Sequence, residues 1–167
     1  ITGAGTSCTS TAGPTTASLV STYTCSITAT NVGSYTANFS YPGDNYYIAV
    51  SAGPQTVSPG KVSPIVAVSV NSTTQALGTS EVFTATVTGS PGATAPTGTG
   101  TWSFAGTGSP SAAACNSNTG PTPVSNVTTY TCTVVDTQAG TYKATFAYPG
   151  DVNYNLVAAT APSSSTT

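Results

Sequence analysis

"TYKATFAYPGD" at residues 141–151 closely repeats "SYTANFSYPGD" at residues 34–44, and the two stretches lie 107 positions apart. The same offset relates Cys8 to Cys115 and Cys25 to Cys132, and it runs without an insertion or deletion as far as Tyr154. A fixed offset is typical of a repeated unit. Because this unit is about as long as a small domain, the sequence predicts tandem domains of about 107 residues.

The composition favours β-structure and excludes several partners. The chain of 167 residues has two Lys or Arg, four Asp or Glu and no His. Val, Thr and Tyr are abundant and favour strands. With so few basic residues to neutralise phosphates, no nucleic-acid partner is expected. No apolar run approaches the roughly 20 residues of a membrane-spanning helix, so no membrane insertion of this segment is expected.

Alternating apolar and polar residues predict short strands in residues 61–167. In residues 81–88, Phe83, Ala85 and Val87 alternate with threonines, as in a strand buried on one face. Gly-Pro and Pro-Gly pairs, Gly120-Pro121 among them, are read as turns. The expected strands are 64–71, 81–88, 98–104, 111–115, 128–135, 141–148 and 153–160. Seven short strands with frequent turns predict an all-β sandwich.

The four cysteines occupy matched places in the two repeats. Disulfides Cys8–Cys25 and Cys115–Cys132 are therefore expected, which favours an oxidising, extracellular compartment, either secreted or at the cell surface. Free buried thiols and a metal site are the alternatives. Thiolates split between two domains without His are poor zinc ligands, so no metal is expected.

Two motifs then resemble a known family. "DTQAGTYKA" at 136–144 resembles the entry to the sixth strand of immunoglobulin-like (Ig-like) domains. "YPGDNYY" at 41–47 and "YPGDVNY" at 148–154 are similar to the bacterial Ig-like tandem repeats of large extracellular surface and adhesin proteins. The resemblance covers nearly the whole chain and implies an Ig-like β-sandwich.

The resemblance also implies roles for core residues. Tyr142, and Tyr35 in the first repeat, correspond to the corner tyrosine whose hydroxyl bonds to upstream backbone. Trp102 corresponds to the core tryptophan. Ala85 and Ala144 stand where antibody domains have the intersheet disulfide.

The repeat predicts an incomplete first domain. Residues 1–60 align with 108–167, so they are expected to form the C-terminal part of a first Ig-like repeat, and 61–167 a complete second repeat with a C-terminal linker. A half-sandwich is expected to expose Tyr35, Ala37 and Phe39. Two completions are open. Either a segment like 61–107 precedes Ile1 in a longer array of repeats, or an identical subunit donates strands to build a filament.

No catalytic residue or cofactor is expected, so an enzyme is not predicted. A nucleophile needs an activating base, and His is absent. Asp44 and Asp151 occupy the same motif in different repeats and are expected to accept hydrogen bonds in turns. Calcium at a repeat junction is a weaker alternative, because one carboxylate per repeat is few for that ion. A Lys–Asn crosslink needs a buried Lys, and neither Lys is predicted to be buried.

The sequence therefore predicts a structural or adhesive module, a stiff segment of an extracellular stalk or fibre. The alternative is a carbohydrate-binding module that uses Tyr46, Tyr47 and Tyr154. Three sequons, at Asn38, Asn71 and Asn126, are the expected acceptors if the host attaches glycans. Asn71 and Asn126 fall in or near predicted loops and are the better candidates.

Overall fold

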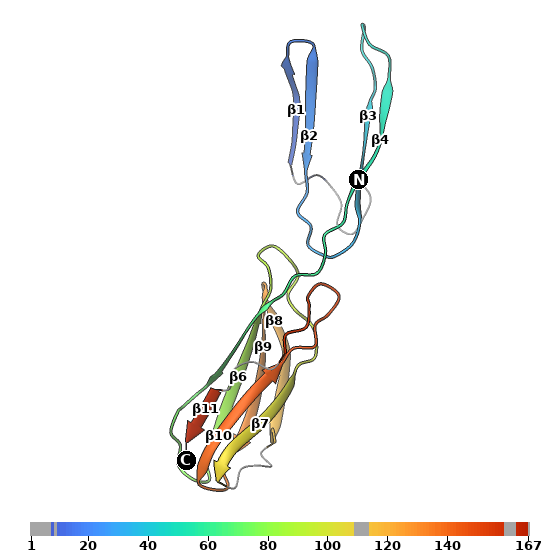
Figure 1. The fold of residues 1–167 in the computed structure, drawn as a ribbon. Helices are drawn as coiled ribbons and strands as arrows, with labels where there is room; N and C mark the ends of the chain where they lie inside the picture. The colour runs from blue at the N-terminus through green and yellow to red at the C-terminus, as the bar shows by residue number, and fades with distance from the viewer. Residues whose placement is uncertain (1–7, 9, 109–113, 159–162, 167) are drawn as a thin grey trace. The chain divides into compact units, whose positions relative to one another are not determined.

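The computed structural model describes residues 8, 10–108, 114–158 and 163–166 (Figure 1). These residues form eleven β-strands and no helix. All the pairings between these strands are antiparallel. The all-β class predicted from composition is therefore confirmed.

The chain divides into two compact units, residues 1–60 and 61–167, called here unit 1 and unit 2. Unit 2 contains a four-stranded and a three-stranded sheet, and unit 1 contains two two-stranded sheets.

The larger sheet of unit 2 has the strand order β5-β6-β9-β8, and the smaller sheet has the order β11-β10-β7 (Figure 1). The strands are β5 (Ile65–Val70), β6 (Ser80–Thr88), β7 (Thr101–Gly108), β8 (Ser117–Val124), β9 (Val127–Val135), β10 (Gly140–Ala147) and β11 (Ser163–Thr166). Figure 1 shows β10 and β7 in front of β6 and β9.

Side-chain alternation places the core of unit 2 between its two sheets. In β6 every second residue, from Glu81 to Val87, is buried, and the threonines between them are half-buried. β9 and β10 alternate in the same way. The buried residues form two clusters that each draw on both sheets, and Trp102 packs against both clusters. Unit 2 is thus a β-sandwich, with the inward positions that the period of two predicts.

Unit 1 consists of two hairpins. β1 (Ser10–Ala17) pairs with β2 (Val20–Ser26), and β3 (Tyr35–Tyr41) pairs with β4 (Val50–Val57). Tyr35 is the one fully buried side chain that the structure describes in these strands, with 3% of its surface exposed. The predicted exposure of Ala37 and Phe39 is correct, whereas the predicted exposure of Tyr35 is wrong, because its side chain is buried and its hydroxyl bonds to the Asn31 carbonyl oxygen.

Two predicted strands differ from the structure. The fourth was expected at 111–115, but residues 111–113 lie outside the described part, Cys115 is not in a strand, and β8 instead spans Ser117–Val124. Gly120-Pro121, predicted to be a turn, lies inside β8 as a cis peptide bond. The seventh was expected at 153–160, where the described residues form only isolated bridges, while the strand beside β10 is β11.

Candidate functional site

Each unit contains one disulfide, Cys8–Cys25 in unit 1 and Cys115–Cys132 in unit 2. Each bond joins cysteines 17 positions apart, and these are the pairs that the repeat predicts. Cys132 is fully buried on β9, whereas Cys25 at the matching place on β2 is exposed. The disulfides are therefore equivalent in sequence but differ in how the rest of each unit covers them.

Each unit also has a tyrosine whose hydroxyl bonds to backbone four residues upstream. The Tyr142 hydroxyl donates to the Gln138 carbonyl oxygen at 3.0 Å and accepts from the Gln138 N–H at 3.3 Å. In unit 1 the Tyr35 hydroxyl donates to the Asn31 carbonyl oxygen at 2.9 Å. Both rings are 3% exposed. These hydrogen bonds hold the start of each strand against the loop that precedes it.

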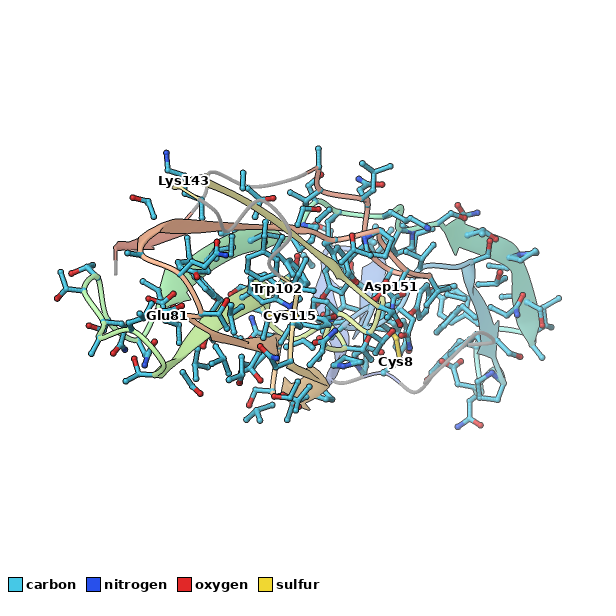
Figure 2. The ribbon with its side chains drawn as sticks, turned by 90° about the horizontal axis from the view of Figure 1, so that it is seen from below. Cys8, Glu81, Trp102, Cys115, Lys143 and Asp151 are labelled. Carbon is cyan, nitrogen blue, oxygen red and sulfur yellow. A yellow bond between two sulfur atoms is a disulfide. The ribbon has the colours of Figure 1, made fainter. Side chains whose placement is uncertain are left out.

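Trp102, Ala85 and Ala144 lie in the core of unit 2. Trp102 is half-buried and packs edge-on against Phe146, with ring centroids 5.0 Å apart. Its indole Nε1 is buried, and the described residues offer it no hydrogen-bond acceptor. Ala85 and Ala144 are fully buried on opposite sheets. Figure 2 shows Trp102 among packed side chains, while Lys143 points away from them.

The YPGD turn of unit 2 is organised by one carboxylate. Asp151 accepts hydrogen bonds from the N–H groups of Asn153 and Tyr154, from the Tyr148 hydroxyl, and from the N–H of Thr97 at 2.6 Å. Partial burial acts to raise the pKa of Asp151, but these hydrogen bonds outweigh it and hold the pKa below the usual value of 3.8. Burial, reinforced by the hydrogen bond to Asp151, raises the pKa of Tyr148.

The YPGD turn of unit 1 repeats the internal part of this network. Asp44 accepts from the Tyr41 hydroxyl and from the N–H groups of Tyr46 and Tyr47. The Tyr41 hydroxyl lowers the pKa of Asp44, and the same hydrogen bond raises the pKa of Tyr41 to about 12. The role expected for both aspartates, as acceptors in turns, is therefore what the structure shows.

Unit 1 carries an open groove between its hairpins. The larger part has a volume of about 790 Å³ and is lined by β2 and by β3 and β4, with Tyr23, Phe39 and Ala52 among its residues. A second part of about 610 Å³ shares Tyr23 and Phe39 with it and reaches Asp44. This continuous surface is called here the unit 1 groove. Its lining includes the exposed rings of Tyr23 and Phe39.

The three tyrosines considered for carbohydrate binding differ in their exposure. Tyr46 is 90% exposed and Tyr47 is 63% exposed. Tyr154 is fully buried, and its hydroxyl donates to the Thr94 carbonyl oxygen at 2.7 Å. The inclusion of Tyr154 is therefore wrong, because a buried ring cannot stack on a sugar.

The three sequon asparagines lie in different settings. Asn38 is exposed on β3 and lines the unit 1 groove. Asn71 is exposed after β5, and its side-chain oxygen accepts from the Val82 N–H. Asn126 is half-buried in the β8–β9 turn and donates to the Gly89 carbonyl oxygen. The preference for Asn71 agrees with its exposure, whereas the preference for Asn126 over Asn38 is wrong, because Asn126 is half-buried and its amide is hydrogen-bonded.

Two buried acids were not singled out from the sequence. Glu81 and Asp136 are both fully buried in unit 2. Glu81 shares the parity of Phe83 and Ala85 along β6, and that signal would have predicted its burial. Both lysines are exposed. Among the described residues, no group of three or more His, Cys, Asp or Glu side chains is placed to hold a metal ion.

Comparisons of the chain with protein-family models, with curated proteins and with solved structures gave no match. Within the part of the chain that the structure describes, no helix is long and apolar enough to cross a membrane.

Proposed function

We propose that the chain is a structural segment of an extracellular stalk or fibre, built from tandem Ig-like repeats. The observation that carries this proposal is the recurrence of one set of features 107 residues apart. The set comprises the disulfide, the tyrosine hydroxyl bonded to upstream backbone, and the aspartate-centred YPGD turn.

The strand orders of unit 2 support the Ig-like part of the proposal. Constant-type Ig domains place strands A, B, E and D in one sheet and C, F and G in the other. If β5 to β11 are taken as A to G, the orders β5-β6-β9-β8 and β11-β10-β7 correspond to this arrangement. The hydroxyl bond of Tyr142 is the one that a tyrosine corner makes.

Composition and crosslinks support the location and the mechanical role. Structural disulfides persist in oxidising compartments, and both disulfides lie within single units. The connection between the units contains Pro59 and Pro64, which restrict the backbone of a linker. Tandem sandwiches joined by such a connection suit a spacer better than a catalyst.

Immunolabelling of intact cells of the source organism tests this function. An antibody raised against the chain is expected to label cells before permeabilisation, while an antibody against a cytoplasmic protein labels only permeabilised cells. Labelling by both antibodies only after permeabilisation would exclude the extracellular role.

Carbohydrate binding is the second proposed function, favoured by the exposure of Tyr46 and Tyr47 in one loop. Exposed aromatic rings bind sugars by stacking. A glycan array compares the chain with its Tyr46→Ala variant. Binding that this substitution weakens supports the second function, and an array without any bound glycan removes it.

A further inference from the structure

The unit 1 groove has a covered counterpart in unit 2, which identifies what fits it. Tyr23 and Phe39 correspond to Tyr130 and Phe146 at the 107-residue offset. The Tyr23–Phe39 ring centroids are 5.0 Å apart with a 40° interplanar angle, and the Tyr130–Phe146 values are 4.8 Å and 42°. The ring pair is therefore arranged in the same way in both units.

The two ring pairs differ in what covers them. Tyr23 and Phe39 are each 42% exposed, whereas Tyr130 is 3% exposed and Phe146 is fully buried. In unit 2, Trp102 packs against Phe146 with ring centroids 5.0 Å apart, and Ala85 and Val87 belong to the same buried cluster as Phe146. The residues that make the difference are thus on β6 and β7, inside the segment 61–107.

Neighbouring positions repeat this contrast. Ala37 and Cys25 are exposed, whereas their counterparts Ala144 and Cys132 are fully buried. Tyr47 is 63% exposed, whereas its counterpart Tyr154 is fully buried. At these positions, which line both parts of the groove, the side chains are therefore open in unit 1 and covered in unit 2.

The hydrogen bonds of the YPGD turns show the same difference between the two units. The loop of each unit supplies two backbone N–H groups and one tyrosine hydroxyl to its aspartate. In unit 2, segment 61–107 adds the N–H and hydroxyl of Thr97, and Lys61 Nζ donates to the Asp151 carbonyl oxygen. Asp44 is the charged residue among those that line the groove. In an added segment, the lysine at the place of Lys61 would lie near Asp44, as Lys61 lies near Asp151 in unit 2.

We propose that the unit 1 groove is a docking site for a three-stranded polypeptide segment with the sequence pattern of residues 61–107. By analogy with the clusters of unit 2, Ala85 and Val87 of its second strand would pack with Tyr23 and Phe39, and its tryptophan would pack on Phe39. Phe83 of that strand would pack with Cys25 and Ala37. The inference rests on the repeat relation in the proposed function, and is independent of the extracellular location.

The occupant is an additional segment of this pattern, not residues 61–107 of another copy. In every copy these residues already pair with β9 and β10 of their own unit 2, through the β6–β9 and β7–β10 ladders. Withdrawing them would uncover Tyr130 and Phe146 in the donor while covering Tyr23 and Phe39 in the acceptor. Such an exchange gains no net burial.

The test supplies the segment to the whole chain. A second copy of residues 61–107 is fused directly before Ile1, because Ile1 matches Gly108 at the 107-residue offset and the fusion repeats the connection present in unit 2. The matched control carries Phe83→Asp and Val87→Asp in the added copy only. Hydrogen exchange is then followed by mass spectrometry in β2 and β3, with β9 and β10 of the same molecule as internal standards.

In the unmodified chain and in the control fusion, amides of β2 and β3 are expected to exchange much faster than those of β9 and β10. In the fusion with the unaltered segment, the exchange rates of the β2 and β3 amides should fall by at least about tenfold and approach those of β9 and β10. A synthetic peptide of residues 61–107 added to the unmodified chain provides a second measurement in the same direction.

Two results overturn the proposal. One is equal exchange of β2 and β3 in the two fusions while β9 and β10 remain protected. The other is strong protection of β2 and β3 in the unmodified chain that rises with protein concentration, because a second copy then covers the groove. Either result leaves the cell-labelling test of the proposed function unaffected.

Discussion

At the scale of single residues, Tyr142 and its counterpart Tyr35 each have two structural roles. The ring of Tyr142 fills core space beside Ala144, and its hydroxyl closes the loop that begins β10. The ring of Tyr35 is as well buried although unit 1 exposes much of its apolar surface. In both units, then, a buried tyrosine ring is combined with a hydroxyl that bonds to the loop before its strand.

Replacing Tyr142 with Phe separates the contribution of the ring from that of the hydroxyl. The substitution keeps the ring and removes the hydroxyl with its two hydrogen bonds to Gln138, so unit 2 should lose about 1 kcal/mol or somewhat more of its free energy of unfolding. Denaturant unfolding followed by Trp102 fluorescence measures this loss. Tyr46→Phe is the control, because Tyr46 is 90% exposed, and it should leave the midpoint unchanged. Equal midpoints for Tyr142→Phe and the wild type would mean that the hydroxyl bond contributes nothing to stability.

Asp151 predicts a pH dependence of unit 2. Its pKa in the folded chain lies below the ordinary 3.8, so the charged form stabilises the fold above that value. This contribution is lost as the pH falls through the folded pKa. Asp151→Asn should therefore lower the unfolding midpoint at pH 7, and the difference from the wild type should shrink below about pH 4.

Denaturant midpoints of Trp102 fluorescence at several pH values check this prediction. The matched control is Asp44→Asn, which changes the same motif in unit 1 and should leave the Trp102 transition unaltered at each pH. A difference between Asp151→Asn and the wild type that stays constant from pH 7 to pH 2.5 contradicts the assignment.

At the scale of elements, the entry to β7 depends on a residue without a side chain. A Cβ atom built on Gly100 would overlap the ring of Phe146, which is fully buried against Trp102 and Tyr130. Close approach of the chain to this ring therefore requires glycine. The contact places β7 firmly on β10 at one end of the sheet.

Gly100→Ala should destabilise unit 2 by roughly 1–3 kcal/mol, because a packed ring must move to admit the methyl group. Thermal or denaturant unfolding of Trp102 fluorescence measures the change. Gly60→Ala is the matched control, since a Cβ atom there meets nothing within 4 Å. Similar midpoints for both variants would show that Phe146 repacks without cost.

The strands that sequence predicted correctly have alternating apolar residues. β6, β9 and β10 were expected at almost their observed bounds because one face of each is buried and the other is threonine-rich. β8 was missed because Gly120-Pro121 is typical of turns, yet β8 is an edge strand, where a residue without an N–H is tolerated. β11 reads SSST and has no apolar alternation to reveal it.

The groove was predictable in part. The offset between repeats predicts that unit 1 lacks a counterpart of 61–107 and exposes Phe39. It could not predict that Tyr35 stays buried, because that depends on the loop conformation around Asn31. Nor could it predict that the Tyr23–Phe39 pair keeps the geometry of its covered counterpart, because ring geometry depends on side-chain packing in three dimensions.

At the scale of the whole molecule, the two units offer different stabilities to compare within one chain. Unit 2 has a core enclosed by two sheets, and unit 1 has matching residues that stay open to solvent. A single unfolding free energy does not describe a chain of this kind, because its parts need not unfold together. The chain has one tryptophan, Trp102, so its fluorescence reports on unit 2.

The disulfides provide the sharpest comparison between the units. Cys115–Cys132 and Cys8–Cys25 close loops of the same length, because each pair of cysteines is 17 positions apart. Chain-entropy arguments give roughly 3 kcal/mol for such a loop. Replacing Cys115 and Cys132 with Ser should lower the free energy of unfolding of unit 2 by about that amount. The Trp102 fluorescence transition should therefore move to a lower denaturant concentration. Replacing Cys8 and Cys25 with Ser should leave the Trp102 transition in place, because the buried residues packed with Trp102 all belong to unit 2.

Non-reducing peptide mapping of the wild type should first recover both disulfides within their own units. A Cys8–Cys115 bond in that map, or a Trp102 transition that moves equally in both variants, would show that the units do not fold separately.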